Sequence, residues 1–223
     1  MLALLPLAVV AGGVGAYLGN RNLSRALPLT GRSLLFAGAG LVAVALSLLL
    51  PFAAEGPATT AGAVVAVAVL AGGLLSDLRE REVDIVPLFV GALAVGAGPL
   101  IDAGDAIGIT GALVGLLLST GVYAFGRLYA QLRGLGLDPE TGERLDPLGA
   151  GDIALLTLLG ALAAPVAGAV AAVPILLVGF VFHVAGTVAL FLVRRLRGRD
   201  ASVGDPVELA PFLVAATLVV LHG

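Results

Sequence analysis

Two aspartates stand where charged segments meet long apolar runs. Asp77 ends one run, and Asp152 begins another directly after Gly149 and Gly151. Ionisable groups at membrane depth are costly, so their presence indicates function by default. Two carboxylates suffice for aspartic proteolysis, because one ionised group activates water while its protonated partner polarises the scissile carbonyl. Either acid taken alone is explained equally well as a helix cap or as a loop charge.

The two glycines strengthen the interpretation of Asp152. Gly149 and Gly151 remove side chains next to this carboxylate, so backbone or substrate can approach it closely. Glycine also tolerates unusual dihedral angles where a loop enters a helix. The sequence therefore predicts Asp77 and Asp152 as a catalytic pair, with Gly149 and Gly151 in the active-site loop.

The composition is that of a protein whose solvent is lipid. Hydrophobic residues make up 59% of the chain and charged residues 12%, against about 25% charged in ordinary soluble domains. There is no cysteine and there are two histidines, which excludes disulfides and thiolate ligands and argues against a histidine metal site. No phosphate-binding loop or nucleic-acid patch occurs. We expect no metal, no cofactor and no nucleic-acid partner.

Apolar runs separated by charged or Pro/Gly-rich breaks predict a single all-α membrane domain of about eight transmembrane helices. A spanning helix needs about 20 residues. The opening MLALLPL has no positive charge, so we interpret the first run as a retained helix rather than a signal peptide. Residues 127–149, rich in turn formers, are predicted to form a flexible cytoplasmic loop. The predicted spans are residues 2–18, 34–53, 58–76, 85–101, 106–126, 150–164, 167–193 and 207–222.

Arginine predicts the orientation of these spans. All 12 basic residues are arginines, and in the eight-span arrangement they occupy alternate connections only. The other connections carry acids such as Glu55, Asp102 and Asp105, interpreted as solvated loop charge. The positive-inside rule then places the arginine-bearing connections in the cytoplasm and both termini outside. Asp77 and Asp152 would both face the cytoplasm.

Four segments resemble the type IV prepilin peptidase family. Gly149-Ala-Gly-Asp152 matches the GxGD signature of membrane aspartyl proteases, and DLREREVDIVP, from Asp77 to Pro87, is similar to the family's first-aspartate segment. GAYLGNRNLSRALPLTGRS, residues 15–33, resembles its N-terminal cytoplasmic segment, and PVELAPFLVA, residues 206–215, resembles the start of its last helix. The four segments occur in the family's order, and they imply a GxGD aspartyl protease fold.

The resemblance implies an aspartic endopeptidase of a prokaryotic cytoplasmic membrane that removes short basic leaders from prepilin-type precursors. Its partners would be those precursors and membrane lipids; the oligomeric state is left open. The cysteine zinc motifs of bifunctional members are missing, so N-methyltransferase activity is not implied. Asp84 stands near the position where the family usually has Asn. Residues at matching positions, which would contact substrate or border the site, are Arg79, Asp84, Pro87 and Pro211.

Two other functions account for the same acids. Presenilin and signal-peptide-peptidase-like proteases share GxGD, but they place the first aspartate after tyrosine, where this chain has Ser76. A non-enzymatic proton-coupled transporter would use Asp77 and Asp152 as a relay and would cleave no precursor. That alternative leaves the ordered set of motifs unexplained.

Two features inside the predicted spans are explained by structure rather than by function. His183 lies within the seventh span and is interpreted as an interior histidine with satisfied hydrogen bonds. Gly111 and Gly115 have the GxxxG spacing of closely packed helices, although such matches arise by chance among 32 glycines.

Overall fold

A computed structural model describes residues 42–80, 84–132, 149–196 and 209–223, with the backbone alone for residues 75–80. These ranges form helices joined by short connections and contain no strand. The predicted span 2–18, the segment 15–33 and most of the predicted loop 127–149 lie outside them. The helices are α3 (Pro57–Glu80), α4 (Ile85–Ala103), α5 (Ile107–Leu132), α6 (Ala150–Ala167), α7 (Ala172–Leu196) and α8 (Ala210–His222), preceded by a short apolar helix, Val42–Ala54, whose end is the 3-10 helix η1 (Leu50–Ala54).

The predicted all-α membrane fold is confirmed in its class. Within the described ranges five helices, α3 to α7, are long and apolar enough to cross a membrane. Helix α8 has 13 residues and so extends about 20 Å, less than the roughly 30 Å of a hydrocarbon core. The count of eight spans therefore stays a prediction. Helix α5 continues to Leu132, so the loop predicted over 127–149 is wrong for its first residues.

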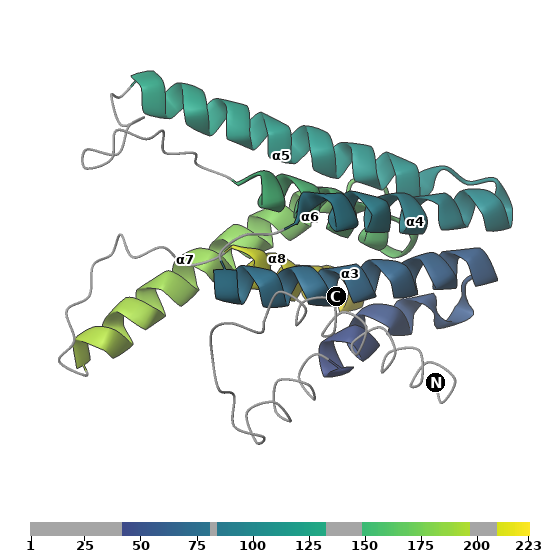
Figure 1. Cartoon of the computed structure of the whole chain (residues 1–223), viewed down its shortest axis with the longest axis horizontal. Coiled ribbons are helices and arrows are strands. Elements are labelled where there is room, and N and C mark those ends of the chain that lie inside the picture. The colour runs from purple at the N-terminus through teal and green to yellow at the C-terminus, as the bar shows by residue number, and fades with distance from the viewer. Residues whose placement is uncertain (1–41, 81–83, 133–148, 197–208) are drawn as a thin grey trace.

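Helix α6 is the centre of the bundle (Figure 1). It contacts α3, α4, α5, α7 and α8. Of its span, 61% is buried inside the protein, compared with 22% for α5 and 17% for α7. Its run ALLTLLGALAA mixes leucines with small residues, and small residues let neighbouring helices approach closely in a membrane.

Helices α5 and α6 touch backbone to backbone. A Cβ atom added at Gly111 would overlap the Gly160 carbonyl oxygen, and one added at Gly115 would overlap the carbonyl oxygen of Leu156. From the other side, a Cβ at Gly160 would meet the carbonyl oxygen of Gly111 at 2.5 Å. Small residues permit this approach, and the GxxxG spacing of Gly111 and Gly115 marks a real packing face.

Asp102 joins α3 to α4 at one end of the bundle. Its carboxylate accepts hydrogen bonds from the Ala58 N–H at 3.1 Å, the Thr59 N–H at 2.7 Å and the Thr59 hydroxyl at 2.8 Å. These donors belong to the first turn of α3, where a carboxylate satisfies unpaired N–H groups and the helix dipole. Asp102 is exposed, as expected of a solvated charge, but it lies in the last turn of α4 rather than in a loop, and it caps a neighbouring helix.

Successive helices run in opposite directions, so the arginines of the described helices lie at one end of the bundle, which also carries Asp84 and Asp152. The ends of α3, α5 and α7 and the starts of α4, α6 and α8 lie together, at the left of Figure 1. We call this the arginine end, because it holds the arginines of the described helices: Arg79, Arg127, Arg194 and Arg195. Glu55, Asp102 and Asp105 belong to the opposite end. This is the segregation that the alternating arginines predicted.

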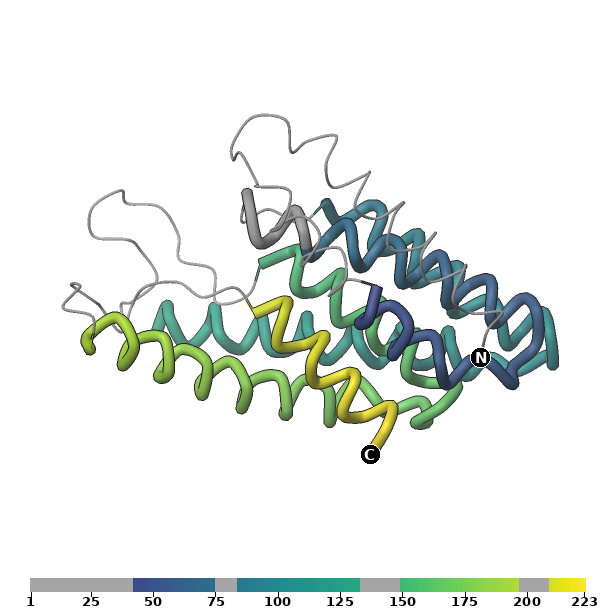
Figure 2. Tube along the Cα trace, turned by 90° about the horizontal axis from the view of Figure 1, so that it is seen from below, coloured from purple at the N-terminus to yellow at the C-terminus, as the bar shows by residue number. Residues whose placement is uncertain are grey.

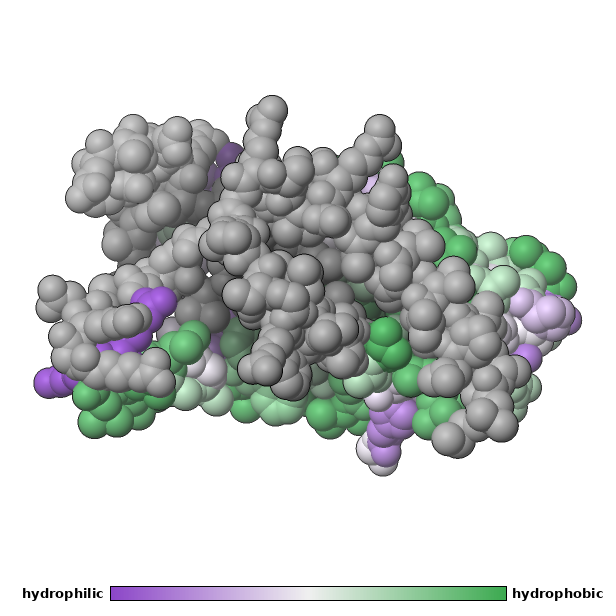
Figure 3. All heavy atoms as spheres, turned by 60° about the horizontal axis from the view of Figure 1, so that its bottom comes forward, coloured by the Kyte–Doolittle hydropathy of each residue, from purple (hydrophilic) through white to green (hydrophobic). Residues whose placement is uncertain are grey.

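The outer faces of the long helices are apolar. Large hydrophobic side chains are exposed along α4, α5 and α7, including Leu93 (73%), Leu117 (72%) and Leu196 (85%), and hydrophobic residues cover much of the described surface in Figure 3. A soluble monomer rarely exposes continuous apolar faces of this extent. Together with the spans, they are the surface of a multi-pass membrane protein.

Helix α8 closes one side of the bundle. It packs on α6 and α7 and lies between α7 and the helix Val42–Ala54 (Figure 2). At its end, Nε2 of His222 lies 2.9 Å from the Ser47 carbonyl oxygen. The start of α8 lies at the other end of the helix, at the arginine end and near the start of α6 (Figure 2).

The close contact of α5 with α6 predicts the effect of one added methyl group. Gly111→Ala should lower the stability by about 1–3 kcal/mol, since overpacking forces the helices apart. Gly121→Ala, in the same helix with nothing within 4 Å of the new Cβ, should leave stability unchanged or higher, because alanine favours helix. Thermal unfolding in detergent measures both, and equal melting temperatures for the two variants would contradict the contact.

Candidate functional site

Asp152 lies in the first turn of α6, where its carboxylate caps the helix. The Gly149 N–H donates to Asp152 Oδ2 at 3.1 Å, and the Asp152 N–H donates to the Gly149 carbonyl at 3.1 Å. The capping role is therefore real. It occupies one carboxylate oxygen, and within the described ranges no hydrogen bond reaches Oδ1. The side chain is half-buried, so a partly enclosed carboxylate keeps one oxygen open to a ligand.

Asp77 lies in the last turn of α3, at the same end of the bundle as Asp152. It follows the first residue of α3, Pro57, by 20 positions (77 − 57), which is about 30 Å along the axis and matches the thickness of the hydrocarbon core. Both aspartates thus belong to helix turns at one edge of the membrane-spanning region. The side chains of Asp77 and Arg79 lie outside the described part of the chain.

Gly149 is not required by the backbone conformation. Its φ of −73° and ψ of 156° are ordinary extended values, so the expectation of unusual dihedral angles was wrong at this position. A Cβ here would lie 3.5 Å from Asp152 Oδ2, an ordinary contact. Gly149 is exposed, and Gly151, inside the first turn of α6, is half-buried. What glycine contributes at position 149 is open space beside the carboxylate.

The other predicted border residues begin helices at the arginine end. Asp84 caps α4, accepting the Val86 N–H through Oδ1 at 3.2 Å. Pro87 lies exposed in the first turn of α4, and Pro211 half-buried in the first turn of α8. Each position has a local structural reason, since prolines and capping acids favour first turns. Their shared end of the bundle agrees with a border role but does not require one.

His183 was misjudged from the sequence. Its Nδ1 is buried, and no group in the described part of the chain bonds to it, so it is not a satisfied interior histidine. The ring packs edge-on against Phe212, with centroids 5.4 Å apart and planes at 84°. The sequence did contain a signal that His183 is unusual, because it is a titratable group inside an apolar span.

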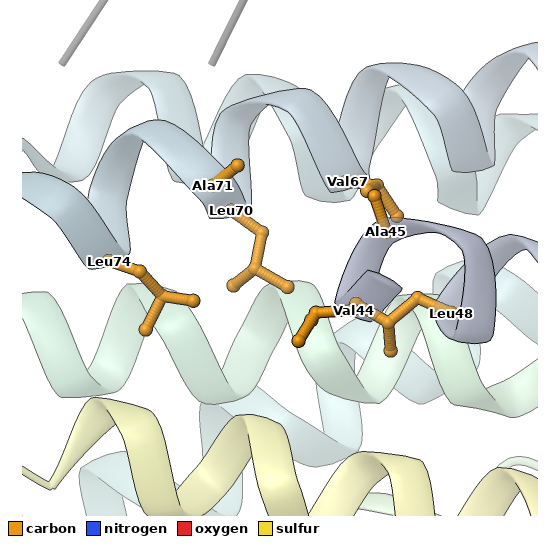
Figure 4. A pocket seen from close by; sticks show the side chains of 7 residues that line it. All are labelled: Val44, Ala45, Leu48, Val67, Leu70, Ala71 and Leu74. Atoms are coloured by element: carbon orange, nitrogen blue, oxygen red, sulfur yellow. The ribbon is translucent and has the colours of Figure 1, made fainter. Parts of the chain in front are cut away.

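An apolar pocket lies away from these residues, between the helix Val42–Ala54 and α3 (Figure 4). It has no polar side chain that could hold water or polarise a carbonyl. Across the described ranges, no three His, Cys, Asp or Glu side chains form a group that could hold a metal ion. The pocket is lined by Val44, Ala45, Leu48, Val67, Leu70, Ala71 and Leu74.

No family model, curated protein or solved structure matches the chain. The residues at the arginine end therefore carry the functional inference by themselves.

The cap formed by Asp152 predicts how two substitutions differ. Asp152→Asn keeps an oxygen that can accept the Gly149 N–H, so its stability should stay close to that of the unmodified protein. Asp152→Ala leaves that N–H without its partner and should cost about 0.5–2 kcal/mol. Thermal unfolding of both variants in detergent checks this, and an equally stable alanine variant would contradict the cap. The asparagine variant is thus the appropriate one for tests of chemistry.

Proposed function

We propose that the chain is a membrane aspartic endopeptidase with Asp77 and Asp152 as its catalytic pair. Its substrates would be type IV prepilin-like precursors, cleaved after their short basic leader at the cytoplasmic face of a prokaryotic inner membrane. The observation that supports this most is that the two acids belong to separate helices, α3 and α6, whose relevant turns lie at one end of the bundle. The open Oδ1 of Asp152 and the exposed Gly149 add room for a substrate.

The chemistry follows from two carboxyl groups in one site. Close like charges cannot both ionise readily, so the pair holds one proton, which belongs to the pair rather than to either residue. The ionised member takes a proton from water as the water oxygen attacks the scissile carbonyl carbon. The protonated member hydrogen-bonds the carbonyl oxygen, and a proton then passes to the departing amine nitrogen. No metal is needed for these steps.

The depth of the two helix turns suits this substrate class. A precursor with a basic leader and a hydrophobic helix has its junction at the membrane surface, since the leader stays in water. Asp77 and Asp152 occupy turns at the edge of the spanning region. Water can reach a peptide bond at that depth without crossing the hydrocarbon core.

The catalytic pair is tested by substituting each acid alone. Asp77→Asn and Asp152→Asn should each lower cleavage of a prepilin-type precursor in liposomes by about a thousandfold or more, because members of one catalytic unit are not redundant. Mass spectrometry of the products measures this. Asp105→Asn, at the opposite end, is the matched control and should cleave normally. Cleavage that persists in either catalytic variant would refute the pair, and proton-coupled uptake without any cleavage would establish transport instead.

The space beside Asp152 predicts a graded effect at Gly149. Gly149→Ala should fold normally, since the new methyl group makes only an ordinary contact, yet it should lower kcat/KM by about tenfold by crowding the approach to the carboxylate. Gly149→Val should lower it further. Full activity of both variants would show that the glycine serves neither substrate nor chemistry.

The proposed orientation can be tested cleanly because the chain has no cysteine. Ala103→Cys and Leu196→Cys place single thiols at exposed positions on opposite ends of the bundle. In intact spheroplasts, a membrane-impermeant maleimide should label Cys at 103 and should label Cys at 196 only after permeabilisation. The reverse pattern would put the arginine end, and the two aspartates, outside the cell.

A further inference from the structure

His183 and Asp152 lie at similar depths in the bundle. Helices α6 and α7 meet where a Cβ on Gly160 would contact the Ala172 methyl group at 3.3 Å. From this point toward the arginine end, Asp152 is about 12 Å along α6 and His183 about 16 Å along α7. This register puts both residues on the same side of the contact between α6 and α7, toward the arginine end.

The imidazole ring is held in place from α8. Phe212, in the first turn of α8, meets the ring edge-on at a centroid distance of 5.4 Å. Gly186 makes room for this arrangement, because a Cβ there would come within 2.6 Å of the Phe212 ring. Aromatic pairs favour this geometry. His183 is thus a packed ring, although part of its side chain stays accessible.

The packed ring leaves a polar atom unused. Nδ1 of His183 is buried and, in the part of the chain that the structure describes, has no hydrogen-bond partner. In the neutral imidazole, Nδ1 is a hydrogen-bond donor in one tautomer and an acceptor in the other. A buried donor or acceptor without a partner is destabilising. Asp152 offers a free acceptor, because Gly149 bonds to Oδ2 and, in the described part of the chain, no hydrogen bond reaches Oδ1.

We propose that His183 is a positioning residue for Asp152, whose open carboxylate oxygen it binds through Nδ1, directly or across one water molecule, once substrate has closed the site. This proposal rests on the proposed peptidase function. The Gly149 N–H holds one oxygen of the carboxylate and the imidazole the other, which sets the rotation of the carboxylate. The remaining lone pairs then face the water that the aspartate pair activates.

Two substitutions distinguish the role of the aromatic ring of His183 from that of its Nδ1 atom. His183→Phe keeps an aromatic ring against Phe212 and removes both nitrogens. His183→Asn gives up the ring but places an amide close to the position of Nδ1. A residue that acts through packing alone is replaced well by phenylalanine and poorly by asparagine, whereas a residue that acts through Nδ1 shows the opposite order.

The kinetic test uses the full-length protein in liposomes with a prepilin-type precursor. His183→Phe should lower kcat about 10–100-fold, the usual effect of losing a group that orients a reactive ligand, with KM unchanged. His183→Asn should recover most of that loss. The matched control is His222→Phe, which alters the other histidine, at the end of α8 remote from Asp152, and should leave kcat unchanged.

Each alternative result overturns the proposal. Normal kcat in His183→Phe means that Nδ1 has no part in the reaction. A raised KM with unchanged kcat means that His183 binds substrate rather than positioning Asp152. A loss in His183→Asn as large as in His183→Phe means that ring packing is what matters. Melting temperatures of the variants verify that each is folded.

A second readout needs no substrate turnover, so it separates this proposal from the peptidase assignment. The infrared band of Asp152, the carbonyl stretch of its protonated form or the carboxylate stretch of its ionised form, is identified by its loss in Asp152→Asn, and a bound, uncleavable precursor peptide closes the site. His183→Phe should shift this band, while His222→Phe should not. An unshifted band refutes the positioning role even in an active peptidase, and a shifted band in a protein that cleaves nothing keeps the pairing while the peptidase function fails.

Discussion

The backbone contact between α5 and α6 determines the rest of the arrangement. Gly111, Gly115 and Gly160 let two helices touch without intervening side chains, and lipid supplies no hydrophobic force that could substitute for such close packing. Because α5 packs directly against it, α6 is the buried central helix of the bundle, and α4, α7 and α8 also pack on it. The depth and direction of its first turn, and hence of Asp152, are consequences of that contact. A mobile α6 would leave the carboxylate without a defined position.

A buried apolar axis also explains why the chemistry gathers at one end. Along most of α6 every side chain meets another helix, so polar groups are tolerated only where a backbone donor or water satisfies them. Asp152 meets this condition through Gly149, as Asp102 does at the opposite end through Ala58 and Thr59. The two acids differ in how many carboxylate oxygens accept a hydrogen bond. Asp102 accepts through both oxygens, whereas Asp152, like the caps Asp84 and Asp105, uses one and, in the part of the chain that the structure describes, keeps the other free. Of these three single-oxygen caps, Asp152 is half-buried and the other two are exposed.

The sequence predicted what depends on local pattern and missed what depends on tertiary partners. Hydropathy placed a span at 85–101 where α4 covers Ile85–Ala103, because a helix in lipid must be continuous and apolar. The same pattern could not distinguish the packing of Gly111 from a chance match, since its partner, Gly160, is remote in sequence. It overvalued the dihedral freedom of Gly149 and missed the capping role of Asp102, because the donors come from another helix. His183 was judged satisfied for the same reason: pairing is a property of neighbours, which periodicity does not report.

The unused hydrogen-bonding capacity at the arginine end has a physical meaning of its own. A protein interior satisfies its buried polar atoms almost completely, and exceptions persist where a function depends on them. Here the buried, unpaired Nδ1 of His183 and the accessible Oδ1 of Asp152, to which no hydrogen bond is formed within the described ranges, occur on helices that pack together. Their proximity, beside an exposed glycine and in the same region as the last turn of α3, is the expected form of a site organised for a polar ligand before that ligand binds.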